Sequence, residues 1–563
     1  MKTLSVYSLL IMICLAGAQV SVTAQDLENI AKEKAVTISG GASARMMFYS
    51  ASGIPQRRKP FSYVLTGSPV VSLYGITIPL YFVYSEQERS FRQPFNQFGM
   101  SPRYKWVTVH GGYRNINYSP YTLAGHTMLG GGVDLTPGIF RFGFMYGRLN
   151  RATAVDTTSG SFDAYQYNRR GYAAKIGVGK GSNFLDLIMI HAKDDSTSVG
   201  DVGTKVQRVS PAENVVFGLS GAYTFHNLFV EGDAGLSLYT NNIGSSIAFD
   251  SIPEILKNTL GKFININGST EFYSAYSFAV GYRVKDLSLK VQYKRIDPDF
   301  KSMGSYFFNN DLENITISPS FSLLNRKIHI AGSLGLQRDN LQNQKESTSR
   351  RVIGSGNVSA TITERLGVDL TYTNFTTRQK PGRVFVADTF LITQTTGNIG
   401  IMPRYMVAKE NITHTVLLSW NYMNLVDLNS ATASNNNLNS TNMFLNYQVI
   451  LPQKNLTLFV NLNSAKLNSA TTETGNKGVT LGGNKNMLDN KLTLGLSVSV
   501  MQSTTAGKSS LLLNDGLQCT YRVNTHHSFN TNMNYIGSYP GQSQPENPRF
   551  SEFRGEVAYM INF

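Results

Sequence analysis

The chain has 563 residues and a formal net charge of +15, from 51 Lys and Arg against 36 Asp and Glu. Its only cysteines are Cys14 and Cys519, which excludes a small domain held together by several disulfides. The basic charge would suit nucleic acid, anionic lipid head groups or acidic solutes.

The first 24 residues predict a secretory signal peptide. Lys2 supplies a positive charge, and residues 4–16 form an apolar run shorter than the ~20 residues of a membrane helix. Small residues at 22–24 precede the expected cut, and the alternative is an uncleaved anchor helix. Loss of Lys2 leaves a charge of +14. In an exported chain we expect lipid head groups or acidic solutes as partners, and no nucleic acid.

We expect residues 25–34 to be a short periplasmic segment, and residues 35–563 to form one domain of alternating strands. The stretch 270–295 shows the unit: apolar side chains occupy every second position, and Lys285-Asp286 forms a tight polar turn. Alternation with period two, closed by such a turn, predicts a β-hairpin. The unit recurs at 328–337, 366–373, 443–462 and 528–535.

The connections favour a membrane barrel over a soluble sandwich or propeller. One set is short, at 136–138, 180–182, 225–227, 285–286, 325–327 and 409–411. The alternate set is long, at 151–166, 194–211, 241–268, 297–311, 339–348, 427–437 and 539–548. Strict alternation of short and long connections is typical of barrels with short periplasmic turns and long extracellular loops. We therefore predict an all-β protein: a closed antiparallel transmembrane β-barrel of 24–26 strands.

The last strand carries a further pattern. Tyr559, Ile561 and Phe563 share one face of the C-terminal segment GEVAYMINF. In this ending the chain resembles bacterial outer-membrane β-barrel proteins. The blocks FRQPFNQFGMSPRYKW and SPYTLAGHTMLGGGVDLTPGIFRFGFMYGR resemble barrels of Bacteroidota. The resemblance implies an outer-membrane location, and it implies that Tyr559, Ile561 and Phe563 are read by the barrel-assembly machinery.

Two segments depart from the hairpin pattern. Residues 87–103 carry two prolines and no clean alternation, so they are a candidate to enter the lumen. The loop 241–268 contains DSIPEILKNTLGKF, in which Pro253 follows a capping pair and apolar residues share one helical face. This helix is either a constriction of the lumen or a short external helix packed on its own loop.

Basic residues on the polar face suggest the function. Arg141, Arg283, Lys290 and Lys294 share the parity of that face, with few acids in the same strands. Because rings of Lys and Arg favour anions, we expect a porin-like or gated channel for polar and anionic solutes. The alternatives are a partner barrel in a secretion or gliding assembly and, less favoured, a barrel-embedded hydrolase. Lipopolysaccharide phosphates could also bind these cations.

The sequence contains no motif that predicts an enzyme, a metal or a cofactor. The stretches TTAGKSS (504–510) and GVGKGS (177–182) both lack the full spacing of a phosphate-binding loop. The eight histidines are scattered, and His526-His527 lies in a predicted turn. We therefore assign no catalytic, cofactor-binding or metal-binding residue from the sequence.

Overall fold

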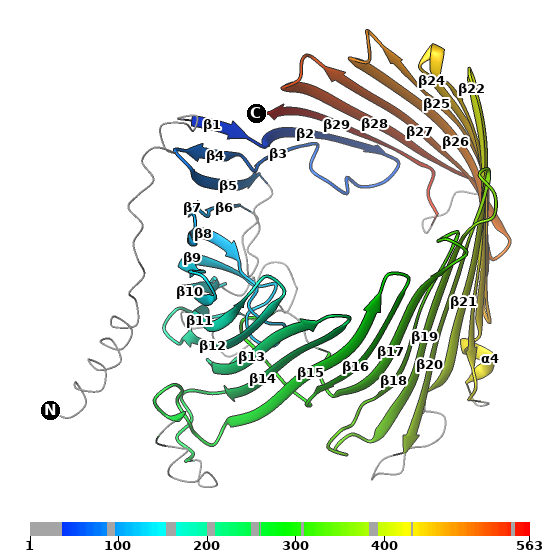
Figure 1. Cartoon of the computed structure of the whole chain (residues 1–563). Helices are drawn as coiled ribbons and strands as arrows, with labels where there is room; N and C mark the ends of the chain where they lie inside the picture. Colours follow the sequence, from blue (N-terminus) through cyan, green and yellow to red (C-terminus); the bar gives the residue numbers. More distant parts are fainter. Residues whose placement is uncertain are drawn as a thin grey trace.

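The computed structural model describes residues 36–86, 96–153, 165–199, 209–248, 258, 260–305, 309–381, 392–429, 432–541 and 547–563. These residues form a closed antiparallel barrel of 26 strands with almost no helix, as predicted (Figure 1). The predicted signal peptide and the segment 25–34 lie outside the described residues. No helix in the described part of the chain is long and apolar enough to cross a membrane.

The strand segments are β1 (Val36–Ser39), β2 (Gly41–Ser52), β3 (Phe61–Gly67), β4 (Val70–Leu73), β5 (Ile76–Ser85), β6 (Gln97–Met100), β7 (Arg103–Tyr104), β8 (Val107–Asn115), β9 (Thr127–Leu135), β10 (Phe140–Asn150), β11 (Asn168–Lys180), β12 (Asn183–Asp195), β13 (Glu213–Phe225), β14 (Leu228–Thr240) and β15 (Thr270–Val284). They continue with β16 (Leu287–Ile296), β17 (Leu312–Leu323), β18 (Ile328–Arg338), β19 (Ser347–Thr361), β20 (Leu366–Pro381), β21 (Thr393–Lys409), β22 (Ile412–Asp427), β23 (Leu438–Leu451), β24 (Leu456–Ser469), β25 (Glu473–Met487), β26 (Leu492–Thr505), β27 (Lys508–Arg522), β28 (His527–Pro540) and β29 (Phe550–Asn562). Short helical turns occur at α4 (Ala433–Asn436) and η2 (Pro452–Lys454).

Three wall strands are each built from two segments: β1 with β2, β3 with β4, and β6 with β7. The ring closes where β2 pairs with β29 over twelve residues, from Gly41–Asn562 to Ser52–Ser551. At the end of this seam, the backbone N–H of Phe563 donates to the carbonyl of Gly40 at 2.9 Å. Closure satisfies the backbone groups of both edge strands, which an apolar surrounding could not do.

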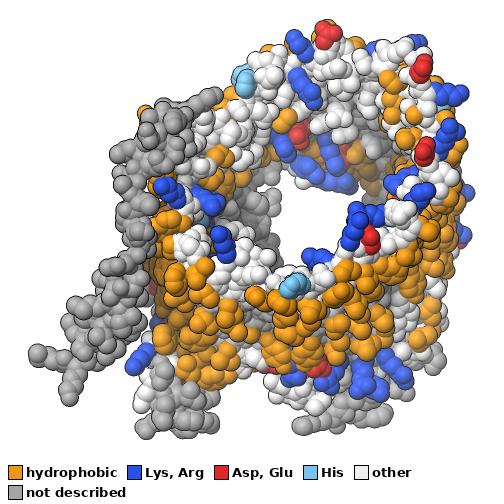
Figure 2. Space-filling model, viewed as in Figure 1, with side chains coloured by type: hydrophobic (Ala, Val, Ile, Leu, Met, Phe, Trp, Pro, Cys, Tyr) orange, Lys and Arg blue, Asp and Glu red, His pale blue; other side chains and the backbone are white. Residues whose placement is uncertain are grey.

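The alternation of the sequence places apolar side chains on the outside of the wall. Phe140, Leu187 and Leu496 are each about 60% exposed, and their neighbours along each strand point inward. Figure 2 shows the resulting apolar outer surface and a central opening with Lys and Arg side chains around it. An apolar exterior around a polar interior is the arrangement expected of a barrel surrounded by lipid.

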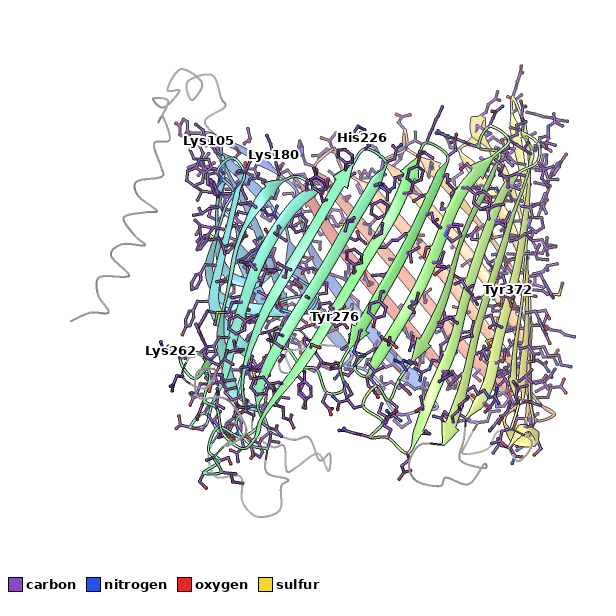
Figure 3. The ribbon with its side chains drawn as sticks, turned by 60° about the horizontal axis from the view of Figure 1, so that its bottom comes forward. Lys105, Lys180, His226, Lys262, Tyr276 and Tyr372 are labelled. Atoms are coloured by element: carbon purple, nitrogen blue, oxygen red, sulfur yellow. The ribbon has the colours of Figure 1, made fainter. Side chains whose placement is uncertain are left out.

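The two rims differ in their connections. One rim carries turns of two to four residues and is called the short-turn rim; Lys105, Lys180 and His226 lie on it (Figure 3). The opposite, long-loop rim carries the longer connections, with Lys262 among them. The expected strict alternation is wrong at two places, because residues 470–472 and 506–507 form short turns on the long-loop rim. Because the strands on either side of these turns pair almost to their ends, a short turn is enough to connect them.

Two loops of the long-loop rim fold into the barrel and form an inner layer, at 116–126 and 297–305. Their backbones meet where the N–H of Ala124 donates to the carbonyl of Gly304 at 3.0 Å. Leu123 and Phe300 are fully buried between these loops and the inner face of β9 to β16, next to Met145 and Ile190. The main apolar core of the described residues therefore lies inside the barrel, along one side of the wall.

The structure places parts of the two segments that depart from the hairpin pattern. Residues 97–100 of the stretch 87–103 form wall segment β6, and the last residue of the stretch begins wall segment β7 (Arg103–Tyr104); both segments pair with β5 and β8. The break between β6 and β7 at Pro102 interrupts the alternation of apolar and polar residues, so the sequence does not show a clear strand here. Residues 87–95 lie outside the described residues. In the loop 241–268, Leu260 and Ile264 pack on the outward residues Val215 and Leu238. This part of the loop covers the outside of the wall, and most of the predicted helix lies outside the described residues.

Candidate functional site

The four cations predicted to line the lumen occupy different environments. Arg141 makes a two-pronged ion pair with Asp186, with N–O distances of 2.7 and 2.9 Å. Lys290 pairs with Glu231. The guanidinium of Arg283 lies over the ring of Phe229, 5.0 Å from its centre. Lys294 is half-buried and has no ion pair with any described residue. The four side chains therefore do not form one site.

Few acids lie in the same strands as these cations, but acids from other strands pair with two of them. Asp186 lies two strands from Arg141, because β11 separates β10 from β12. Glu231 likewise lies two strands from Lys290, on β14. Long side chains cross the intervening small residues, such as Gly177 beside Arg141. Acids counted along the same strand could not show these pairs.

The structure assembles a different basic group, at the loop between β2 and β3. This loop, residues 53–60, has the sequence GIPQRRKP and contains three consecutive cations, Arg57, Arg58 and Lys59. β3 begins opposite Phe48, four residues before β2 ends at Ser52. The N–H of Tyr49 donates to the carbonyl of Pro60 at 2.9 Å, so the loop turns back below the rim. Figure 1 shows the β2–β3 connection turned toward the inside of the ring.

Strand register determines which side chains of the wall lie side by side beneath this loop. Asn534, Arg554 and Tyr49 form one row across β28, β29 and β2. Asn532 and Glu556 lie in the next row, with Met47. All alternate with outward residues such as Tyr535 and Phe553, so they face the lumen. On β28 and β29 these rows lie near the middle of the strand, and on β2 they lie closer to its end at Ser52.

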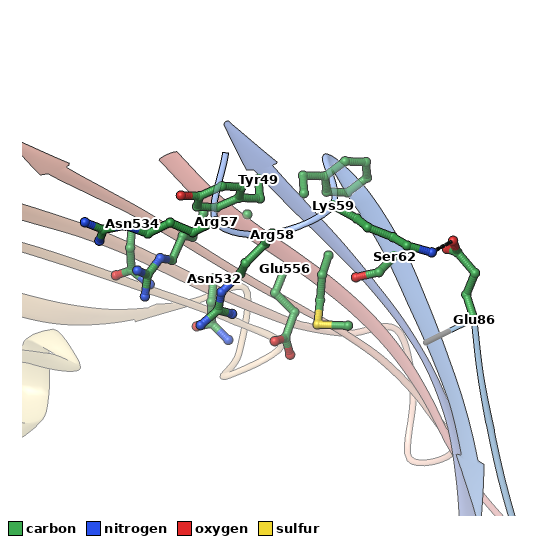
Figure 4. Close-up of a pocket in the computed structure, with 13 residues that line it drawn as sticks. Tyr49, Arg57, Arg58, Lys59, Ser62, Glu86, Asn532, Asn534 and Glu556 are labelled. Atoms are coloured by element: carbon green, nitrogen blue, oxygen red, sulfur yellow. Dashed lines mark hydrogen bonds and ion pairs between the residues drawn. The ribbon is translucent and has the colours of Figure 1, made fainter. Parts of the chain in front are cut away.

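Loop and wall together enclose a cavity of about 570 Å³, called here the loop pocket. Figure 4 shows Arg57 and Arg58 extending from the loop over the strands that carry Asn532 and Asn534. The cavity is lined by Met47, Phe48, Tyr49, Arg57, Arg58, Lys59, Ser62, Glu86, Asn532, Asn534, Arg554, Gly555 and Glu556.

Glu552 anchors the loop to the wall. Its side chain is 2% exposed and accepts a hydrogen bond from the hydroxyl of Tyr49 at 3.0 Å. Arg57 from the loop and Arg554 from the wall pair with the same carboxylate at 3.1 and 2.7 Å. One buried acid thus holds two guanidinium groups side by side. Ion pairs of this kind fix the geometry of side chains more than they add stability.

The remaining charges around the loop pocket are unbalanced. Arg45 pairs with Glu556 at 3.2 Å, and Lys59 pairs with Glu86 at 2.8 Å. Five cations, counting Arg58, therefore stand against three carboxylates. Arg58 has no ion pair or hydrogen bond with any residue that the structure describes. The site carries a local charge of about +2, with Arg58 free to bind an anion.

A second cluster, Ser101, His110 and Asp134, has the order of a catalytic triad. Ser101 Oγ lies 2.8 Å from His110 Nδ1, and His110 Nε2 lies 2.8 Å from Asp134 Oδ2. A nucleophile must be reached by its substrate, but Ser101 is 5% exposed and does not line the loop pocket. We interpret these contacts as hydrogen bonding that satisfies buried polar groups beside β6 and β8.

The described residues contain no group of three His, Cys, Asp or Glu side chains that could hold a metal ion.

The predicted assembly residues lie at the closing seam, where Tyr559 pairs with Ala44 and Ile561 with Ala42. The Tyr559 ring also stacks on His527, with 6.0 Å between ring centres. Sequence reasoning missed the loop pocket, although the run Arg57-Arg58-Lys59 between Pro55 and Pro60 could have indicated it.

Comparisons with known proteins add only distant similarities. No family model matches the chain, and no curated protein matches it. Among solved structures, the outer membrane protein opdK of Pseudomonas aeruginosa has 11% identity and a TM-score of 0.30, over 63% of this chain and 94% of that one. The P pilus usher (PapC) translocation pore has 8% identity and a TM-score of 0.36, over 93% of this chain and 99% of that one. BauA, the ferric preacinetobactin receptor of Acinetobacter baumannii, has 10% identity and a TM-score of 0.35, over 93% of this chain and 81% of that one. Similarity at this level assigns no function.

Proposed function

We propose that this protein is an outer-membrane channel that lets polar solutes pass and prefers anions. The observation that carries the proposal is the loop pocket, which together with its flanking ion pairs groups five cations and three acids on the lumen wall near the middle of β28 and β29. Cations at a constriction attract anions and repel cations, and the effect is strongest where water is restricted. The apolar exterior supports a location in a membrane.

The inner layer supports a restricted rather than a wide passage. A barrel of this size would enclose a broad lumen if its wall were bare. The loops 116–126 and 297–305 occupy the side formed by β9 to β16, and the β2–β3 loop lies at the seam between β29 and β2. Solutes would therefore pass between the inner layer and the loop pocket. Since barrels of the outer membrane have short periplasmic turns and long external loops, the short-turn rim would face the periplasm and the long-loop rim the exterior.

The assembly and surface partners follow from the same proposal. Tyr559, Ile561 and Phe563 would present the last strand to the barrel-assembly machinery before it pairs with β2. Lipopolysaccharide would surround the outer half of the wall. Neither partner requires a residue of the loop pocket.

Liposome swelling tests the proposal. Purified protein is reconstituted, and entry of gluconate is compared with entry of glucose, which has nearly the same size. The proposed channel admits gluconate faster. Faster entry of glucose would contradict anion preference. No swelling, together with a partner that copurifies in stoichiometric amount, would instead favour the structural role in an envelope assembly.

A further inference from the structure

We propose that the loop pocket is a binding site for the phosphate group of a soluble phosphate monoester. This inference rests on the proposed function, because it names the class of solute that the channel would take. It adds a claim of recognition that general anion preference does not require.

The charge of the loop pocket matches a dianion. Glu552, Glu556 and Glu86 each already pair with a cation of the site. Five cations and three carboxylates leave a net charge of about +2. A phosphate monoester carries about −1.5 to −2 at pH 7, so it would balance this charge, whereas chloride or a monocarboxylate would leave about +1. Charge balance therefore favours the phosphate monoester.

The donors of the loop pocket are unused. The Nε of Arg554 is buried and has no hydrogen-bond partner among the described residues. Arg58 and the side-chain amides of Asn532 and Asn534 also have no partner in the part of the chain described, although all three line the cavity. A buried N–H without a partner is destabilising, and an acceptor in the cavity would satisfy it. Guanidinium groups match phosphate oxygens in geometry, and amides can donate to the remaining oxygens.

The place of the loop pocket decides the source of the phosphate. Lipid head groups would contact the outside of the wall and its rims, but the pocket residues alternate with outward residues and face the lumen. The site also lies near mid-height of β28 and β29, away from both rims. The ligand is therefore a solute that enters through water, not a lipid.

Competition for conductance provides the first test. Single channels are recorded in KCl, and glycerol 3-phosphate, acetate or glycerol is added at rising concentration. Glycerol 3-phosphate should reduce the chloride current at a concentration at least tenfold lower than acetate does, and glycerol should have no effect. Equal block by acetate and glycerol 3-phosphate would overturn the inference but leave an anion-preferring channel intact.

Two matched variants locate the effect. Arg58→Gln removes the free guanidinium, and Lys294→Gln removes a lumen cation that lies on β16, outside the pocket. Arg58→Gln should raise the half-blocking concentration of glycerol 3-phosphate at least tenfold, and Lys294→Gln should leave it within about twofold. Heat-modifiable migration on gels confirms that each barrel has folded. Equal shifts in both variants would overturn the assignment to the loop pocket.

Calorimetry separates this inference from the proposed function. Titration of glycerol 3-phosphate into purified barrel in detergent requires no current. Binding that is lost in Arg58→Gln but kept in Lys294→Gln would support the site even if the barrel proved closed. No heat of binding at millimolar concentrations to wild-type protein would overturn it, whatever the conductance. Binding of lipid A with no binding of glycerol 3-phosphate would also overturn it, since the ligand would then be a lipid.

Discussion

Arg57 Nη1 lies 3.1 Å from Glu552 Oε1, which ties the loop between β2 and β3 to the last strand of the barrel. The residues are almost 500 positions apart in the sequence, and the contact exists because β29 closes the ring against β2. Barrel closure and the loop pocket therefore depend on each other. The seam that completes the wall also completes the site.

Replacing Glu552 by Gln should weaken this link. The change removes the charge that holds Arg57 and Arg554, and hydrogen bonds to charged groups contribute about 1.5–3 kcal/mol each. We expect the free energy of unfolding to fall by about 1–3 kcal/mol, measured as a lower urea midpoint for loss of the heat-modifiable form. Glu86→Gln is the control, because its pair with Lys59 is more exposed and should contribute less than about 1 kcal/mol. An equal effect of both variants would contradict the anchoring role of Glu552.

The inner layer makes its own prediction. Phe300 is fully buried and packs edge-on against Tyr121, with ring centres 6.1 Å apart. Phe300→Ala should cost about 3–5 kcal/mol in the packing of the two loops, which is enough to detach them from the wall. The single-channel conductance should rise because the lumen widens. A correctly folded Phe300→Ala barrel with unchanged conductance would show that these loops do not limit the passage.

Acid should release the loop between β18 and β19. Burial opposes ionisation of Asp311, but Lys345 at 2.5 Å and the N–H groups of Leu341 and Asn340 outweigh burial and lower the pKa of this carboxyl. A lowered pKa means that the carboxylate stabilises the fold above the ordinary value of about 4, and that this stabilisation is lost as the pH falls through the lowered pKa.

Hydrogen exchange measures this loss. After correction for intrinsic rates, the amides of Asn340 and Leu341 should be protected at pH 6 and lose protection at acid pH below about 4. Asp311→Asn should lose the protection already at pH 6. Protection that persists in Asp311→Asn would show that the carboxylate charge does not hold this loop.

The closing seam predicts an assembly defect. Phe563 continues the edge that pairs with β2, since its N–H donates to Gly40. Phe563→Asp places a charge beside this edge, so we expect a sharp fall in the amount of heat-modifiable barrel in the outer membrane. Phe563→Tyr keeps an aromatic ring and should assemble normally. Normal levels of Phe563→Asp would contradict the role proposed for Tyr559, Ile561 and Phe563.

The fold was accessible from the sequence because a barrel wall is built from local patterns. Period-two alternation and turn residues such as Lys285-Asp286 are visible within one hairpin. They predicted hairpins along the wall and a strand count of 24–26, but they missed the strand formed by β6 and β7, which is interrupted at Pro102. Register within a hairpin follows from the turn, so the chain order of wall strands is the spatial order.

The site was not accessible, because it depends on contacts between distant segments. Nothing near Arg57 in the sequence indicates Glu552, which comes from the opposite end of the chain. Arg141 and Asp186 likewise meet only after β11 is placed between them. The loops 116–126 and 297–305 carry apolar residues such as Leu123 and Phe300, but each loop folds into the barrel by packing against the other. Sequence parity therefore located cations on the lumen face without showing which ones remain unpaired.

The reversal potential under a KCl gradient shows whether the channel prefers anions. Purified protein in a planar bilayer separates dilute from concentrated KCl, and the zero-current voltage reports which ion passes more easily. We expect a chloride-preferring potential that falls as total salt rises, since the screening length shortens from about 10 Å at 0.1 M to about 3 Å at 1 M. We also expect a reduced chloride preference when Arg57 and Arg58 are both replaced by Gln. A potassium-preferring potential, or an unchanged one in this double variant, would contradict these expectations.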